Sequence, residues 1–112
     1  MADYALLLHD SRARTARVVF ELTGVINEII DSSTLANLDD EHDPEGATVA
    51  FERAQVAVLL ERAHEQLLEC DEALDRIRLG TYGRCERCGS TIPPERLEAK
   101  PATRVCVGCA AG

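Results

Sequence analysis

Four of the five cysteines have the spacing of metal ligands. They form two Cys-x-x-Cys pairs, Cys85 with Cys88 and Cys106 with Cys109, and seventeen residues separate the pairs. Two such pairs can present four sulfur atoms to one tetrahedral ion, which is the pattern of a structural zinc site. Because protein atoms would fill all four positions, no coordination site stays open for a catalytic water molecule. The sequence therefore predicts one structural Zn²⁺ on these four cysteines and no enzyme.

The same spacing would also suit two disulfide bonds in a small secreted domain. We favour zinc because the segment Met1–Tyr4 lacks the basic and apolar regions of a secretory signal. A reducing cytosol also disfavours disulfides. We therefore expect a cytoplasmic protein with a metal-bound four-cysteine site, and we expect the fifth cysteine, Cys70, to be a buried thiol in a helical core.

Residues 81–112 are predicted to form a small zinc ribbon. Large apolar side chains are too scarce there to fold the segment alone, whereas a structural zinc ion contributes about 10–16 kcal/mol in comparable peptides. Residues 93–99 are predicted to include a short helix, and residues 103–105 a short strand leading to the second cysteine pair.

A long helical pattern precedes the ribbon. Apolar residues recur at alternating intervals of four and three, as in a coiled coil; they are Val56, Leu60, Ala63, Leu67, Cys70, Leu74 and Ile77. The first third of the chain has a less regular stripe, formed by Val18, Leu22, Val25 or Ile26, and Ile29. These stripes predict helices over about residues 4–38 and 44–79.

The fold class expected from these elements is mainly α, with a long antiparallel coiled-coil hairpin over residues 1–80 and a small C-terminal four-cysteine zinc ribbon over residues 81–112. A parallel dimer through the second helix alone is the alternative, but it would leave the stripe of the first helix unburied. The formal charge of −8 argues against unaided binding to DNA or RNA. The longest apolar runs, such as Val56 to Leu60, are too short to span a membrane.

The turn between the two predicted helices is strongly acidic. Five of the seven residues from Asp39 to Glu45 are carboxylates. One interpretation is structural, with Asp43 as a helix cap, Glu45 in the first turn and the other acids solvating the loop. The other is that a rod carries an acidic tip to a cationic or metal-containing site on a partner.

The whole arrangement resembles the DksA/TraR family of bacterial transcription factors. The resemblance is carried by Tyr82–Gly89, by Arg96–Pro101 and by Cys106–Cys109, with the seventeen-residue gap. It implies direct binding to RNA polymerase without DNA, with the hairpin in the secondary channel and its tip near the catalytic magnesium.

The resemblance also implies candidate contact residues. The tip would comprise Asp39, Asp40, Glu41, Asp43, Glu45 and Ala47. The family's D-x-x-D-x-A motif matches Asp43 and Ala47, whereas its second aspartate falls on Glu45 or Gly46. Some members bind the alarmone ppGpp, and Arg62 and Lys100 occupy similar places to their basic residues. Glu69 and Ala110 stand where that pattern is basic, so a ppGpp response is not predicted.

Two other functions fit the same elements. The zinc ribbon could be an interaction module for another protein, without a role in the secondary channel. An acidic hairpin tip is also typical of Gre-type transcript-cleavage factors, although those proteins lack this four-cysteine finger. Binding to RNA polymerase, without direct recognition of nucleic acid or membrane, is the leading expectation.

Overall fold

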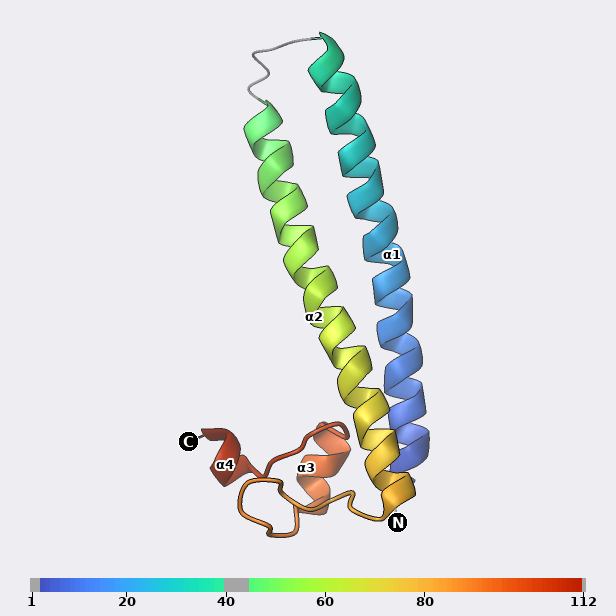
Figure 1. Cartoon of the computed structure of the whole chain (residues 1–112), viewed down its shortest axis with the longest axis vertical. Coiled ribbons are helices and arrows are strands. Elements are labelled where there is room, and N and C mark those ends of the chain that lie inside the picture. The colour runs from blue at the N-terminus through green and yellow to red at the C-terminus, as the bar shows by residue number, and fades with distance from the viewer. Residues whose placement is uncertain (1–2, 40–44, 112) are drawn as a thin grey trace. The chain divides into compact units, whose positions relative to one another are not determined.

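The computed structural model describes residues 3–39 and 45–111, with side chains for residues 3–31 and 47–111 (Figure 1). Its helices are α1 (Tyr4–Asp39), α2 (Glu45–Leu79), α3 (Pro94–Ala99) and α4 (Val107–Ala111). The described part of the chain is mainly helical, as predicted. None of its helices combines the length and the apolar character that crossing a bilayer requires.

Local hydrogen bonds define where the two long helices begin and end. At the start of α1, the Leu6 N–H donates to Oδ1 of Asp3 at 3.1 Å, which makes Asp3 an N-cap. At the end of α2, the Gly80 N–H donates to the Ile77 carbonyl and the Thr81 N–H to the Arg76 carbonyl. This is a Schellman motif, and Gly80 has the left-handed φ of +79° that it requires.

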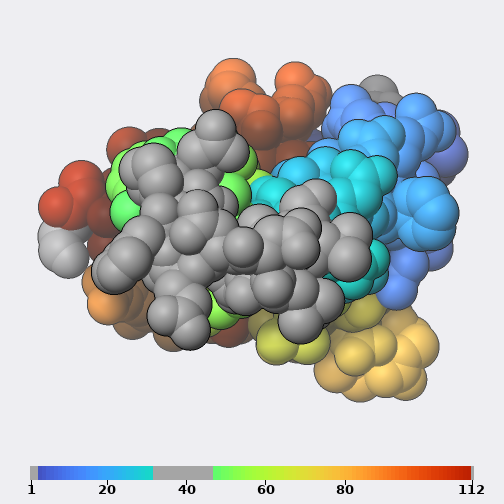
Figure 2. Space-filling model, turned by 90° about the horizontal axis from the view of Figure 1, so that it is seen from above, coloured from blue at the N-terminus to red at the C-terminus, as the bar shows by residue number. Residues whose placement is uncertain are grey.

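Contacts divide the chain into two compact units. The first unit contains the described residues up to Arg14 together with those from Gln66 onwards, and the second contains the described residues between Thr15 and Glu65. Each unit includes a part of α1 and a part of α2. In the second unit, the start of α2 lies beside the later part of α1 in both views (Figure 1, Figure 2).

The core of the first unit shows that α1 and α2 are antiparallel. Leu8, near the start of α1, is fully buried with Cys70 and Ala73, near the end of α2. Arg12 and Asp71 form an ion pair across the same two helices at 2.6 Å. Every residue of the predicted α2 stripe is buried or half-buried, and the prediction of a buried Cys70 thiol is confirmed.

The predicted stripe of α1 is partly wrong. Val18 and Val25 are exposed, at 44% and 41%, whereas Val19 and Ile26 are half-buried. The predicted Leu22, Ile26 and Ile29 do lie on the inner face of α1. They are joined there by other buried or half-buried residues, which are Leu8, Ser11, Thr15 and Val19.

The finger is built mainly from loops and two short helices. An antiparallel bridge joins Arg84 to Thr91, and α3 lies within the predicted helical segment. The predicted strand over residues 103–105 is wrong, because the described structure has no strand there. Instead, the Thr103 hydroxyl donates to the Val105 carbonyl at 2.9 Å, which turns the chain locally.

Candidate metal centre

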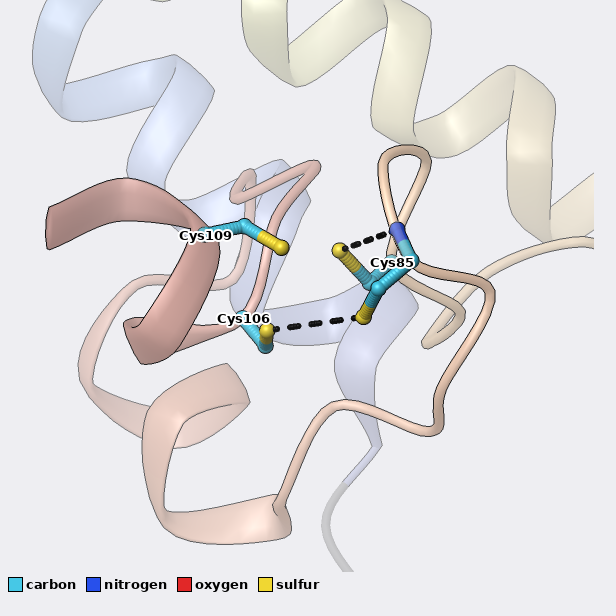
Figure 3. Close-up of side chains that lie close together, drawn as sticks. Cys85, Cys106 and Cys109 are labelled. Atoms are coloured by element: carbon cyan, nitrogen blue, oxygen red, sulfur yellow. Dashed lines mark hydrogen bonds between the residues drawn. The ribbon is translucent and has the colours of Figure 1, made fainter. Parts of the chain in front are cut away.

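The structure brings the four predicted zinc ligands together. Cys85 and Cys88 lie in the loop that follows α2, Cys106 directly precedes α4, and Cys109 lies within α4. Their four Sγ atoms all lie within 4.8 Å of one another. Figure 3 shows Cys106 and Cys109 reaching toward Cys85 from the opposite side of the cluster.

The first cysteine pair, Cys85 and Cys88, lies on a tight turn whose backbone conformation depends on Gly89. The Cys88 N–H donates to Sγ of Cys85 at 3.5 Å, and the Gly89 N–H donates to the Cys85 carbonyl at 2.9 Å. Gly89 has a φ of +75°, which side chains rarely tolerate. Backbone geometry therefore aims both sulfur atoms of this pair at one point.

The distances fit one zinc ion. Zn–S bonds of about 2.3 Å in a tetrahedron place the sulfur atoms about 3.8 Å apart. The Sγ atoms of Cys88 and Cys106 are 3.8 Å apart. The four sulfur donors supply a complete tetrahedral set, so the residues present suit a structural zinc ion.

The electrostatics of the cluster also favour a cation. N–H groups of Cys88 and Cys106 stabilise the Cys85 thiolate and lower the pKa of Cys85 to about 6. The hydroxyl and N–H of Ser90 lower the pKa of Cys88 in the same way. The neighbouring sulfurs of Cys106, Cys85 and Cys88 raise the pKa of Cys109 to about 12. Four thiolates at this spacing would repel one another, and a bound cation would neutralise that repulsion.

The centre rests on the small core of the finger. Cys85 is 2% exposed and packs with Ile92 and Leu97, which are also buried, whereas Cys88 is exposed. Arg87 donates to the Cys109 carbonyl at 3.0 Å and so links the two cysteine pairs. One side of the centre is thus shielded by apolar contacts, while part of the cluster faces solvent.

Arg96 and Thr103 support the centre, although the sequence analysis predicted this role for neither. Arg96 donates through Nε to the Val105 carbonyl at 3.2 Å and through an Nη to the Thr103 hydroxyl at 3.4 Å. Thr103 is only 5% exposed. Together these hydrogen bonds fix residues 103–105, which lie between α3 and Cys106 in the sequence. Arg96 begins the segment Arg96–Pro101, which carries part of the family resemblance, and that segment is the signal that could have indicated it.

The predicted tip lies largely outside what can be described. Asp40, Glu41 and Asp43 fall outside the described residues, and so do the side chains of Asp39 and Glu45. Ala47 is exposed on α2. The two candidate alarmone contacts, Arg62 and Lys100, are exposed and belong to different units.

Comparison with known proteins identifies the finger. Residues 80–112 match the model of the prokaryotic dksA/traR C4-type zinc finger. An uncharacterized protein of Aquifex aeolicus is 59% identical over 44 residues, covering 39% of this chain and 30% of that protein. General stress protein 16O of Bacillus subtilis is 40% identical over 73 residues, covering 65% of this chain and 45% of that protein.

A further relative extends the similarity toward the helices. The RNA polymerase-binding transcription factor DksA of Haemophilus influenzae is 28% identical over 83 residues. The match covers 70% of this chain and 57% of that protein. The chain thus spans between about a third and just over half of these three relatives.

A solved structure shares the fold of nearly the whole chain. Transcription factor DksA2 from Pseudomonas aeruginosa superposes with a TM-score of 0.78 at 24% identity, covering 96% of this chain and 78% of DksA2. The fold, the clustered cysteines and the match over residues 80–112 agree with one another. The finger of this chain is therefore similar to the prokaryotic dksA/traR C4-type zinc fingers, and its fold is similar to that of DksA2.

Proposed function

We propose that this chain is a transcription regulator that binds RNA polymerase directly through the secondary channel. The hairpin tip would lie near the polymerase active site, and the zinc ion would have a structural role in the finger. The observation that carries the proposal is the combination of a dksA/traR finger with a DksA-like fold in one chain. The matched DksA of Haemophilus influenzae is named as a polymerase-binding protein, which supports the same partner here.

The length of the helices suits a protein that reaches into a channel. Helix α2 has 35 residues, which corresponds to about 52 Å of helix. Helix α1 has 36 residues and precedes the acidic segment 39–45, while α2 follows it. A pair of long helices can enter an opening that a globular domain of the same mass could not.

The proposed tip would act through its charge. Asp39, Asp40, Glu41, Asp43 and Glu45 place five carboxylates within seven residues, and Ala47 follows them. Carboxylates attract divalent cations and repel phosphates, and both are found where nucleotides are joined. Because salt screens charges that are exposed to solvent, the effect on transcription should weaken as ionic strength rises.

The zinc ion, when bound to Cys85, Cys88, Cys106 and Cys109, would cross-link the loop that follows α2 to the start of α4. The finger also contributes to the core around the helices, because Tyr82 and Ala102 pack against the cluster of Leu8, Cys70 and Ala73. The metal would therefore stabilise the end of the hairpin that adjoins the finger.

A contact with ppGpp would depend on Arg62 and Lys100, which are the two basic residues in suitable sequence positions. Both are exposed, and neither forms an ion pair within the described structure. We include their alanine variants in the polymerase assay, with and without the alarmone.

The proposal is tested by binding and transcription assays with purified zinc-loaded chain. Binding to core RNA polymerase is measured by pull-down, and the lifetime of promoter complexes is measured with and without the chain. A tip variant changes the five acids to their amides, as D39N, D40N, E41Q, D43N and E45Q. Its control neutralises the same number of exposed acids on the helices, as E21Q, E28Q, E52Q, E61Q and E65Q.

We expect the wild type and the control to bind polymerase and to change the lifetime of promoter complexes. The tip variant should keep most of the binding and lose most of the effect on lifetime. If the wild type does not bind polymerase, the role in the channel is wrong, and an interaction module for another protein becomes the better interpretation. If the tip variant acts like the wild type, the acids are not the effector.

A further inference from the structure

A shallow cavity that is largely open to solvent lies within the first unit, and two of its lining residues, Tyr4 and Tyr82, also pack against the core of the finger. Its volume is about 360 Å³, and its lining comprises Asp3, Tyr4, Ala5, Ile77, Gly80 and Tyr82. These residues come from the start of α1, the end of α2 and the loop that follows α2. The size is near the lower limit of small-molecule pockets, so it suits a single side chain better than a large ligand.

Two aromatic rings form one wall of this cavity. The ring centroids of Tyr4 and Tyr82 are 5.4 Å apart, and the ring planes are tilted by 42°. The Tyr82 hydroxyl donates to the Pro101 carbonyl at 2.8 Å, which fixes the orientation of that ring. Aromatic faces attract cations because their π electrons concentrate negative charge there.

The charges around the cavity have the sign that a cation needs. Asp3 contributes a carboxylate, and none of the described basic residues forms an ion pair with it. The C-terminal end of α2 meets the same cavity at Ile77 and Gly80, where the helix dipole is negative. The N-terminal end of α1, which Asp3 caps, lies at the same cavity and has a positive dipole, so the two helix ends oppose one another. The Asp3 carboxylate is therefore the feature that favours a positively charged guest.

The basic residues of the last turn of α2 do not supply that charge. Arg76 donates to the Ala102 carbonyl at 3.5 Å, and Arg78 pairs with Asp75 at 3.7 Å. Neither arginine lines the cavity. The charge of Arg76 acts on Tyr82 from outside the cavity, but no described basic residue is among the lining residues.

We propose that this cavity binds an arginine side chain of a partner protein. A guanidinium group is planar, stacks on tyrosine rings and pairs with a carboxylate through two donors, so it matches Tyr4, Tyr82 and Asp3 together. The methylene stem of the arginine would contact Ala5 and Ile77, which give the cavity an apolar part.

Exposed leucines next to the lining residues fit a protein partner rather than a free amino acid. Leu6 follows Ala5 and is 66% exposed, and Leu79 precedes Gly80 and is 65% exposed. Large exposed apolar side chains beside a charged pocket are typical of interfaces, where an anchor residue is surrounded by apolar contacts. This inference does not depend on the proposed role at RNA polymerase.

The test uses zinc-loaded chain labelled with ¹⁵N and three capped amino acids as probes. Acetyl-arginine-amide should produce saturable shifts of the amide signals of residues 3–5 and 80–82. Acetyl-lysine-amide should bind more weakly because its ammonium group cannot stack. Acetyl-citrulline-amide has nearly the same shape without the charge and should produce no saturable shift.

Two variants separate the charge from the rings. D3N removes the carboxylate charge but keeps an N-capping side chain, so α1 should still begin at Tyr4. Y4L removes one aromatic face. Each should weaken arginine binding about two- to fivefold, whereas E98Q on the exposed face of α3 should leave the affinity unchanged.

The outcome that overturns the proposal is specific. Equal affinity for the arginine and citrulline probes would show that charge plays no part. Equal affinity for arginine and lysine would remove the guanidinium assignment. Shifts that stay linear up to the solubility limit of the arginine probe, or binding that survives D3N and Y4L unchanged, would show that the cavity is not the binding site.

Discussion

Tyr82 connects the finger to the helices through one side chain. Its ring packs against the core cluster of α1 and α2 and against the core of the finger. Its hydroxyl is bonded to the Pro101 carbonyl, and burial raises the pKa of Tyr82 to about 12. Tyr82 thus combines apolar packing of its ring with a hydrogen bond that holds the backbone at Pro101 in place.

Replacing Tyr82 by phenylalanine should destabilise the protein modestly. Y82F keeps the ring but leaves the Pro101 carbonyl without its donor, which typically lowers the free energy of unfolding by about 0.5–1.5 kcal/mol. Urea denaturation of zinc-loaded protein at neutral pH measures the change. Y4F is the matched control, because no hydrogen bond of the Tyr4 hydroxyl is found among the described residues, and its stability should match that of the wild type.

The same variant should change the alkaline pH dependence of stability. The phenol of Tyr82 has a higher pKa in the folded chain than the ordinary value of 10, so the unfolded chain loses this proton first. The stabilisation is fully present below about pH 10 and is lost as pH rises through about 12. Unfolding curves across this range should fall more steeply for the wild type than for Y82F. Equal slopes would contradict the role of burial.

At the scale of the helices, two glycines offer a pair of opposite predictions. Gly24 lies inside α1, and Gly80 ends α2 with a φ of +79°; a methyl group at either position would meet no atom within 4 Å. G24A should therefore stabilise the protein by about 0.5–1 kcal/mol through helix propensity. G80A should destabilise it by about 1–2 kcal/mol because alanine disfavours the left-handed conformation.

Thermal and urea denaturation of both glycine variants measures these effects without interference from packing. The pair is informative because the same chemical change is made in each variant, and only the backbone conformation differs. A stabilising G80A would mean that the Schellman motif is not maintained in solution. A destabilising G24A would mean that α1 is not regularly helical at that position.

The inner faces of α1 and α2 were predicted from the sequence with different success. The stripe of α2 was predicted correctly because all seven residues are apolar or thiol and keep a regular interval. The stripe of α1 was partly misassigned because Ser11 and Thr15 occupy inner positions, so hydrophobicity alone does not reveal its phase. Cys70 donates to the Ser11 hydroxyl at 3.8 Å, which is a polar contact that periodicity does not indicate.

The metal centre was predictable for a different reason. Cysteine spacing alone indicated which four residues meet, because each Cys-x-x-Cys turn constrains its own pair. The supporting contacts of Arg96 and Thr103 depend on how α3 packs against the segment before Cys106. The types of the residues do not indicate such tertiary contacts. The wrong strand at residues 103–105 has the same origin, since the Thr103 hydroxyl bonds locally to Val105.

At the scale of the molecule, the two contact units should differ in their dependence on metal. The first unit contains the cysteine cluster and a helical core to which Tyr82 and Ala102 contribute. The second unit contains only helical residues among those described, and Ala63 is buried in it. Removal of zinc should therefore weaken one unit more than the other.

Hydrogen exchange with and without a chelator tests this difference. Without metal, amide protection should be lost in residues 81–111 because the finger has too small a core to fold alone. Protection should fall in residues 3–14 and 66–79, which share a core with the finger, and should persist in residues 15–31 and 47–65.

Two cysteine variants serve as controls for the chelator. C70S should behave as the wild type because Cys70 lies outside the four-sulfur cluster, whereas C88A should resemble the chelated wild type even when zinc is present. Unchanged protection after chelation would refute a structural metal, and equal loss in both units would show that the helices depend on the finger along their whole length.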